Sequence, residues 1–129
     1  MLLAGGGAIS QAAEAARAFG LAQQLAGVAL ARLCILVEEL VANLYDHGGV
    51  GEDDEVGLAM ARDSAGIRIS ITDPGLPFDP WSAALPAESD ERGGGAGLSL
   101  IQAWAQQISY RSSGETNHLE LLLPVDWED

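Results

Sequence analysis

Glu39, Asn43 and His47 follow one another at four-residue intervals inside a largely apolar stretch of the sequence. On an α-helix this spacing places the three side chains on one face, within about 80° of one another. A solvated helix face would tolerate any polar residue, and this interpretation accounts for the neighbouring Glu38. Asparagine is nevertheless unfavourable in the middle of a helix, because its side chain competes for backbone hydrogen bonds. The face is therefore a candidate for ligand binding or catalysis.

Asp73 ends an alternating apolar segment and begins the sequence Asp-Pro-Gly-Leu-Pro-Phe-Asp-Pro. A carboxylate here could accept a hydrogen bond from an exocyclic amino group, as in adenine recognition. It would select adenine over guanine, because adenine offers an N–H donor where guanine has a carbonyl. Gly75 would let the backbone turn closely around the group that Asp73 faces. The alternative is an ordinary strand-to-loop turn with an Asx-type hydrogen bond.

The segment from Arg92 to Ile101 holds four glycines ahead of an apolar helical pattern. Glycines that lead directly into a helix leave backbone N–H groups unhindered and present the positive end of the helix to an anion. A flexible linker is the alternative, but a linker would not need an amphipathic helix to follow immediately. The segment therefore favours phosphate binding.

The charge balance limits which ligands the chain could bind. The net charge is -13, and all six basic residues are arginine. An acidic chain repels phosphate backbones, which argues against nucleic acid as a partner. A P-loop is excluded, since it needs a lysine to reach the terminal phosphates. A nucleotide site here would have to neutralise phosphate with backbone N–H groups, an arginine and a magnesium ion.

Length and cysteine usage bound the class of protein. A chain of 129 residues fits one domain, over residues 1–129. The single cysteine, Cys34, has no partner for an internal disulfide. The first residues do not resemble a signal peptide, and no apolar stretch approaches the roughly 20 residues of a membrane span. These features predict a cytoplasmic protein with no membrane partner.

The helices that must position these residues follow from the hydrophobic period. Residues 9–25 are alanine-rich and predict a surface helix. A second helix begins after Gly27 and ends at Gly48 and Gly49, where glycine supplies a left-handed cap. Its apolar stripe has helical spacing and consists of Leu33, Val37, Leu40 and Leu44. A third helix is expected from about Leu98 to Gln107, with Leu98, Ile101 and Ala105 facing inward.

The strands follow from a period of two. Alternation over 56–61 and 67–72, around a turn at 63–66, predicts a hairpin with one buried face. A loop is expected over 73–97, and two further strands, over 108–112 and about 119–123, close the chain. This order predicts an α+β fold, a two-layer α/β sandwich. Its sheet would be mixed or mostly antiparallel, with the helices on one face.

Taken in order, the three polar segments resemble the boxes of the GHKL ATPase superfamily, whose nucleotide site is the Bergerat fold. Residues 39–48 resemble its N-box, 73–80 its first glycine box and 93–98 its second. The tail at 116–119 falls where the last strand of the family passes the adenine. The resemblance covers roughly residues 8–125, and three boxes in the correct order are a specific signal.

The resemblance implies ATP and Mg²⁺ as cofactors and a role for each matched residue. Glu39 would orient and deprotonate the attacking hydroxyl or water, and Asn43 would hold Mg²⁺ through its amide oxygen. Asp73 would bind the adenine amino group, with Gly75 allowing the close approach. The remaining expected nucleotide contacts are the backbone N–H groups of Gly95, Gly97 and Leu98, Arg92 at the γ-phosphate, His47 on the phosphate side, and Thr116. For His47, a packed histidine at the helix end is an equal alternative.

Within the superfamily the sequence is most similar to bacterial anti-sigma-factor serine/threonine kinases. The Pro-Phe-Asp-Pro sequence at 77–80, a short lid expected over 80–92 and the absence of a dimerisation helix carry this similarity. It implies phosphorylation of a small STAS-type anti-sigma-factor antagonist, and binding to a sigma factor or similar regulator. Pro77 departs from the family, because many relatives carry a second glycine there. The strand that often opens such domains is expected to be shortened or missing before Ile9, which bears on partner docking and on homodimerisation.

Two other functions fit the same boxes. The chain could be an ATP-gated module that sequesters a partner with little catalysis. It could also be a detached histidine-kinase catalytic domain, which would need a phosphoacceptor histidine from another chain.

Overall fold

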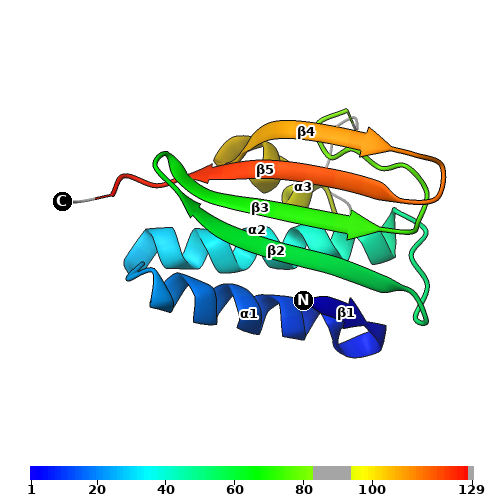
Figure 1. Cartoon of the computed structure of the whole chain (residues 1–129), viewed down its shortest axis with the longest axis horizontal. Helices are drawn as coiled ribbons and strands as arrows, with labels where there is room; N and C mark the ends of the chain where they lie inside the picture. The colour runs from blue at the N-terminus through cyan, green and yellow to red at the C-terminus, as the bar shows by residue number, and fades with distance from the viewer. Residues whose placement is uncertain (83–93, 128–129) are drawn as a thin grey trace.

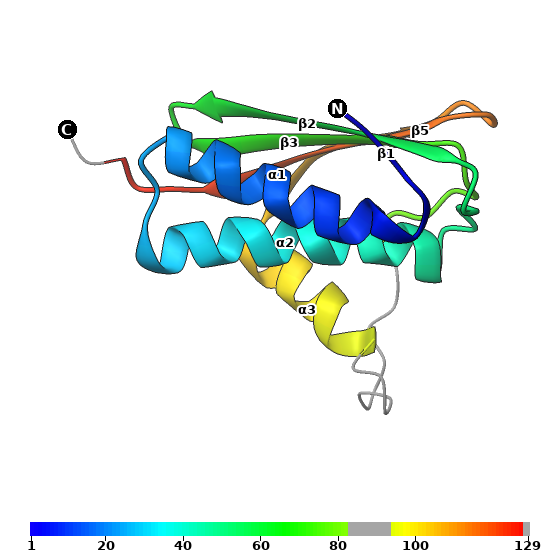
Figure 2. The same ribbon diagram turned by 90° about the horizontal axis from the view of Figure 1, so that it is seen from below.

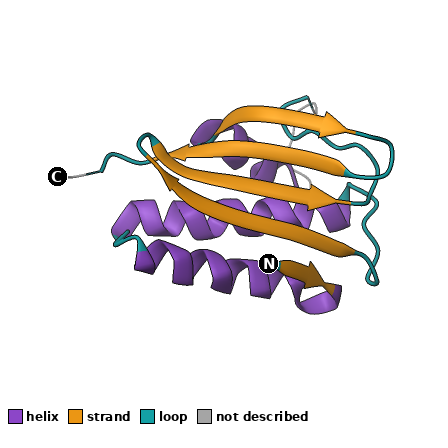
Figure 3. Ribbon diagram, viewed as in Figure 1, coloured by secondary structure: helices purple, strands orange, loops and turns teal. Residues whose placement is uncertain are grey.

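Helices pack against one face of a single sheet in the computed structural model, which describes residues 1–82 and 94–127 (Figure 1). The elements in chain order are β1 (Leu2–Ala4), the 3-10 turn η1 (Gly5–Gly7), α1 (Ala8–Ala22), α2 (Gly27–Asp46), β2 (Glu55–Asp63), β3 (Gly66–Asp73), α3 (Gly94–Trp104), β4 (Gln106–Ser112) and β5 (Asn117–Pro124). Figure 3 shows the same view with helices and strands in separate colours.

The sheet has five strands in the order β1-β2-β3-β5-β4, and every neighbouring pair is antiparallel. The antiparallel form of the predicted sheet is therefore the one observed. Alternation along β2, β3 and β5 sends one set of side chains towards the helices, as the period of two predicted. Ile67, Ile69 and Ile71 of β3 lie opposite Leu123, Leu121 and Leu119 of β5, and all six are buried.

The helical layer lies on one side of the sheet, which Figure 2 shows from below. α1 packs against α2, and α3 packs against α2 as well. The predicted apolar stripe of α2 is buried throughout, as are the three positions in and just after α3 expected to face inward. The two-layer α+β architecture predicted from the sequence is confirmed, and it leaves α2 as the helix that both fills the core and carries the polar residues.

The connection between α1 and α2 is a Schellman motif. Leu25 N donates to Gly20 O at 2.9 Å, and Gln24 N donates to Leu21 O at 3.0 Å. Gln24 occupies the left-handed position of the motif with a φ of 65°, where glycine is the usual residue. A Cβ added to Gly20 would lie 2.6 Å from Leu30 Cδ1, so glycine here permits the close approach of the two helices.

Several boundaries differ from the sequence prediction, and α1, for example, ends at Ala22 rather than at Leu25. α3 begins at Gly94 and ends at Trp104, about four residues early at its start, because the low helix propensity of glycine hid its first turn. β4 begins at Gln106 and carries a bulge between Gln107 and Ser109, which leaves Ile108 outside the ladder and 42% exposed. The opening strand is present but shortened to three residues. No helix within 1–82 and 94–127 has the length and apolarity needed to cross a bilayer.

Candidate functional site

Asn43 is a buried polar residue on the apolar helix α2. Its side chain is 5% exposed, and its amide nitrogen has no hydrogen-bond partner among the described residues. A buried polar atom without a partner costs free energy, about 1–3 kcal/mol, and so calls for an explanation. An amide can also turn over to present its oxygen at the same place, and such an oxygen suits Mg²⁺. The observation fits a residue that is completed by a ligand.

Glu39 lies one helical turn before Asn43 and is half-buried. Burial raises the pKa of its carboxyl, and the neighbouring charges of Glu38 and Asp46 raise the pKa further. A carboxylate with a raised pKa is a stronger proton acceptor, which suits a general base. The N-box pair predicted from the sequence is thus placed on one helix face with the properties that acid–base chemistry needs.

Gly97 of α3 brings the second glycine segment onto the same face. A Cβ added to Gly97 would overlap the Glu39 carboxylate and would lie 3.2 Å from Glu39 Cδ. The absence of a side chain therefore lets the start of α3 approach the carboxylate. Gly95 lies earlier in the first turn of α3, and Leu98 is the fifth residue of the helix with a buried side chain. The first N–H groups of a helix have no intrahelical acceptor, so Gly95 can donate to a ligand, and a phosphate contact from Gly97 stays a prediction.

Asp73 ends β3 as a buried carboxylate with a fixed orientation. Its side chain is 5% exposed, and Oδ2 accepts hydrogen bonds from Gly75 N at 2.9 Å and from Asn117 Nδ2 at 3.1 Å. The Asx-type turn considered for this sequence is therefore present. The second oxygen, Oδ1, makes no hydrogen bond to any residue in the described ranges. The turn and a ligand contact are compatible, because each uses a different oxygen.

Asn117 is a site residue that sequence reasoning missed. It is 2% exposed, and its amide donates to Gly75 O at 2.9 Å and to Leu76 O at 3.2 Å as well as to Asp73. Thr116, which was assigned to this place, lies one residue earlier in the β4–β5 turn, where its backbone bonds with Ser113. The pairing of Asn117 with Asp73 depends on the β3–β5 register, which no local pattern reveals.

The loop after Asp73 is hydrogen-bonded to the segment that follows α2. Leu76 N donates to Gly48 O at 2.7 Å, and a Cβ added to Gly75 would overlap that same carbonyl oxygen. His47 follows the last residue of α2 and stacks on Phe78, with ring centroids 5.8 Å apart. His47 is nevertheless exposed, so the stacking leaves both alternatives open, and its contact with a nucleotide remains a prediction. Gly75 is thus needed for a close approach to Gly48, and the expected close approach to adenine stays a prediction.

The Pro-Phe-Asp-Pro sequence is held mainly through Asp79 and Phe78. Asp79 Oδ1 accepts from Trp81 N at 2.9 Å and from Gln107 Nε2 at 2.7 Å. Phe78 N donates to the hydroxyl of Tyr110 at 2.8 Å. Beyond this anchor, Arg92 and most of the expected lid lie outside the described residues. Among the described residues no group of three His, Cys, Asp or Glu side chains is placed to hold a metal, so a cation here would depend on Asn43 and on ligand oxygens.

The fold and these residues define a class of protein. Residues 5–123 match the histidine kinase-like ATPase domain family, and the chain belongs to that family. The GHKL resemblance inferred from the three boxes is confirmed, and ATP is the nucleotide that membership implies.

Two individual proteins are similar to the chain. The serine/threonine-protein kinase BtrW of Bordetella bronchiseptica is 27% identical over 94 residues, which are 69% of this chain and 66% of that protein. The histidine kinase domain of the blue-light activated histidine kinase EL346 of Erythrobacter litoralis has a TM-score of 0.50 and 21% identity. That match covers 74% of this chain and 47% of the solved chain, and it supports the fold alone.

Proposed function

We propose that this protein is an ATP- and Mg²⁺-dependent serine/threonine protein kinase of the anti-sigma-factor type, acting in the cytoplasm. The observation that carries the proposal is Glu39, a half-buried carboxylate of raised pKa. It lies one turn before Asn43, whose amide nitrogen has no hydrogen-bond partner in residues 1–82 and 94–127. A kinase needs a base beside its phosphate site, whereas a module that only binds ATP does not. The similarity to a protein named as a serine/threonine kinase supports the same reaction.

In the proposed reaction Glu39 orients the hydroxyl of a serine or threonine and takes its proton. The hydroxyl oxygen bonds to the γ-phosphorus of ATP as the bond to the bridging oxygen breaks, and ADP leaves. Bound Mg²⁺ neutralises phosphate charge, and Asn43 is the residue that would hold it. Asp73 accepts the adenine amino group at its free Oδ1, while Gly95 and Gly97 donate N–H groups to phosphate. Arg92, Leu98, Thr116 and His47 remain predicted contacts.

The proposed substrate is a small STAS-type anti-sigma-factor antagonist, with a sigma factor or similar regulator as a second partner. The short β1 edge leaves only three residues for strand pairing with another chain. If a homodimer forms, we therefore expect it to involve more than this edge. Neither partner is expected to be nucleic acid, in view of the net charge of -13.

The first test separates nucleotide binding from catalysis. Calorimetry with ATP and GTP, each with and without Mg²⁺, should give Mg²⁺-dependent binding that favours ATP, and Asp73→Asn should remove the preference. Transfer from γ-labelled ATP to a STAS-type antagonist should then fall about 10²- to 10⁴-fold in Glu39→Gln, the usual contribution of a general base. ATP affinity should stay within a few-fold. Glu38→Gln, an exposed neighbour, serves as the matched control. Normal transfer by Glu39→Gln would refute the assignment of the base.

A further inference from the structure

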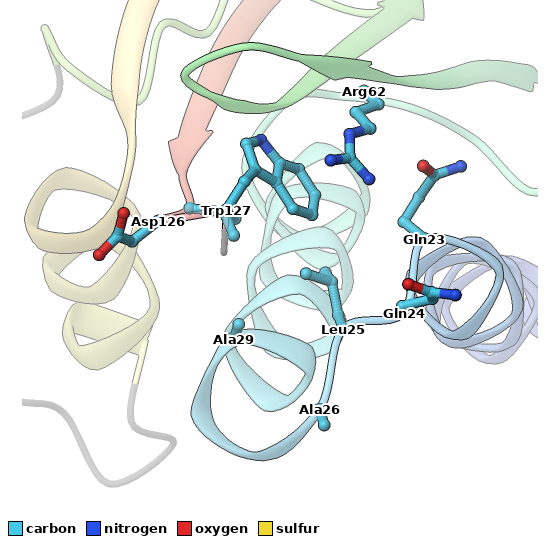
Figure 4. A pocket seen from close by; sticks show the side chains of 9 residues that line it. Gln23, Gln24, Leu25, Ala26, Ala29, Arg62, Asp126 and Trp127 are labelled. Atoms are coloured by element: carbon cyan, nitrogen blue, oxygen red, sulfur yellow. The ribbon is translucent and has the colours of Figure 1, made fainter. Parts of the chain in front are cut away.

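A cavity of about 600 Å³ lies beside the start of α2, at the opposite end of this helix from the N-box residues, and Figure 4 shows the side chains that line it. Three segments far apart in sequence form it: the α1–α2 connection, the end of β2 and the tail after β5. Its volume falls within the range of about 300–1,000 Å³ that is typical of small-molecule sites. Neither the three boxes nor the proposed kinase reaction uses any of its lining residues.

Arg62 supplies an unpaired positive charge to this cavity. Its guanidinium carbon lies 3.9 Å from the centroid of the Trp127 ring, and Trp127 Nε1 donates to Asp63 O at 2.8 Å, which fixes the ring. Within residues 1–82 and 94–127, Arg62 forms no ion pair with any carboxylate. Arg68 differs, because it pairs with Asp63 at 2.9 Å and with Glu120 at 2.8 Å. Arg62 therefore keeps its hydrogen-bond donors available in an otherwise strongly acidic protein.

The other residues that line the cavity provide hydrogen-bond donors and apolar surface. The side-chain amides of Gln23 and Gln24 make no hydrogen bond within the described part of the chain, and Gln23 lies on the Arg62 side of the cavity (Figure 4). Leu25, Ala29 and Val125 contribute apolar wall beside the Trp127 ring. Asp126 also borders the cavity, but its carboxylate points to the side of Trp127 opposite Arg62 (Figure 4).

We propose that this cavity is a second ligand site, for a small planar organic anion such as an aromatic carboxylate or sulfonate. The anionic group would bind the guanidinium of Arg62 and the glutamine amides, because charge-assisted hydrogen bonds to guanidinium are strong. The planar body would lie against Trp127 and Leu25, which supply apolar contact. The proposal is independent of the kinase reaction and of the nucleotide site.

The test uses 8-anilinonaphthalene-1-sulfonate, a planar aromatic sulfonate whose fluorescence rises on binding. The full chain should bind it saturably, with one site per chain. Arg62→Gln should raise the dissociation constant about tenfold or more, which is the effect expected for losing a hydrogen bond to a charged group. Arg68→Gln removes the same charge from an arginine that is already paired with carboxylates. The affinity of this variant for the sulfonate should therefore stay within twofold of that of the unmodified chain.

Two further variants locate the site and guard against misfolding. Ala29→Leu would narrow the cavity without changing any charge, and it should weaken binding while circular dichroism shows an intact fold. Asp73→Asn alters the adenine end only, so binding should persist. The proposal is overturned by the absence of saturable binding, by equal weakening in Arg62→Gln and Arg68→Gln, by normal binding to folded Ala29→Leu, or by loss of binding in folded Asp73→Asn.

Discussion

Gly97 on α3 lies so close to Glu39 on α2 that a single methyl group on Gly97 would overlap the Glu39 carboxylate. The two residues belong to different boxes and lie far apart in the sequence. The fold brings them together, because α3 packs against α2 and the second glycine box thereby meets the N-box. The fit between them is therefore a steric property of the site, and it can be tested directly.

Gly97→Ala should displace the Glu39 carboxylate but change the free energy of unfolding by no more than about 1 kcal/mol, because the overlapped atom is the end of a flexible side chain and alanine favours the helix. It should also reduce phosphoryl transfer by about a hundredfold, because a displacement of about 1 Å at a reacting group has that effect. Thermal unfolding and a transfer assay measure the two effects. Gly6→Ala is the matched control, since a Cβ at Gly6 would meet nothing within 4 Å. Phosphoryl transfer by Gly97→Ala as fast as by Gly6→Ala would contradict the steric argument.

Glu39→Gln should stabilise the nucleotide-free protein at neutral and higher pH. The pKa of Glu39 is raised in the folded state, chiefly by burial, so folding disfavours its ionised form. That penalty is absent below the ordinary glutamate pKa of about 4.3, grows as pH rises, and is complete above the folded-state pKa. The melting temperature of Glu39→Gln should therefore exceed that of the unmodified chain at pH 8, and the difference should shrink towards pH 4. Glu14→Gln, at an exposed position of α1, should show no such trend.

Asn117→Ala should weaken both the fold and the proposed contact of Asp73 with adenine. The change removes the donor for Asp73 Oδ2 and for the carbonyl oxygens of Gly75 and Leu76. Leaving buried acceptors without a donor costs about 1–3 kcal/mol in the free energy of unfolding. ATP affinity should fall because Asp73 loses its fixed orientation. His118→Ala, on the opposite face of β5, should change chemical denaturation and ATP titration far less.

Gln24→Gly should stabilise the protein, by up to about 1 kcal/mol. Gln24 has a φ of 65°, a conformation that costs a non-glycine residue about 1–2 kcal/mol. Glycine removes that cost but loses more conformational freedom on folding, which offsets part of the gain. Gln23→Gly should instead destabilise the protein. Gln23 has a φ of -88°, which any residue adopts without strain, so glycine relieves no backbone strain there. Thermal melts of the two variants should move in opposite directions.

Much of this architecture could be predicted from local patterns. The apolar stripe of α2 and the alternation in β2, β3 and β5 each repeat with a period that fixes the buried face, and all of these faces are confirmed. The start of α3 could not be placed, because its first turn is built from glycines that resemble a loop. Ile108 was assigned to a regular strand, since an apolar residue gives no sign of the bulge that exposes it.

The candidate site likewise contains residues that could be predicted from local spacing and residues that could not. Glu39 and Asn43 were found because a helix places residues of that spacing together, which is a local property. Asn117 was passed over in favour of Thr116, since its contact with Asp73 arises only from the register of two strands. The cavity beside Arg62 was not foreseen, because its walls come from three separate segments. What the sequence does not reveal is the long-range pairing that brings such segments together.

The order of strands has a consequence for folding kinetics. The β2–β3 and β4–β5 pairs each join two consecutive strands through a short turn. By contrast, β3 and β5 pair although a long loop, α3 and β4 lie between them in the chain. Contacts between distant segments form slowly, because their loop entropy must be overcome first. The hydrogen bond between Asp73 and Asn117 spans 44 residues, so we expect it to form in this late step. ATP bound at Asp73 would then stabilise contacts that are absent from the folding transition state, so it should slow unfolding and leave the folding rate almost unchanged.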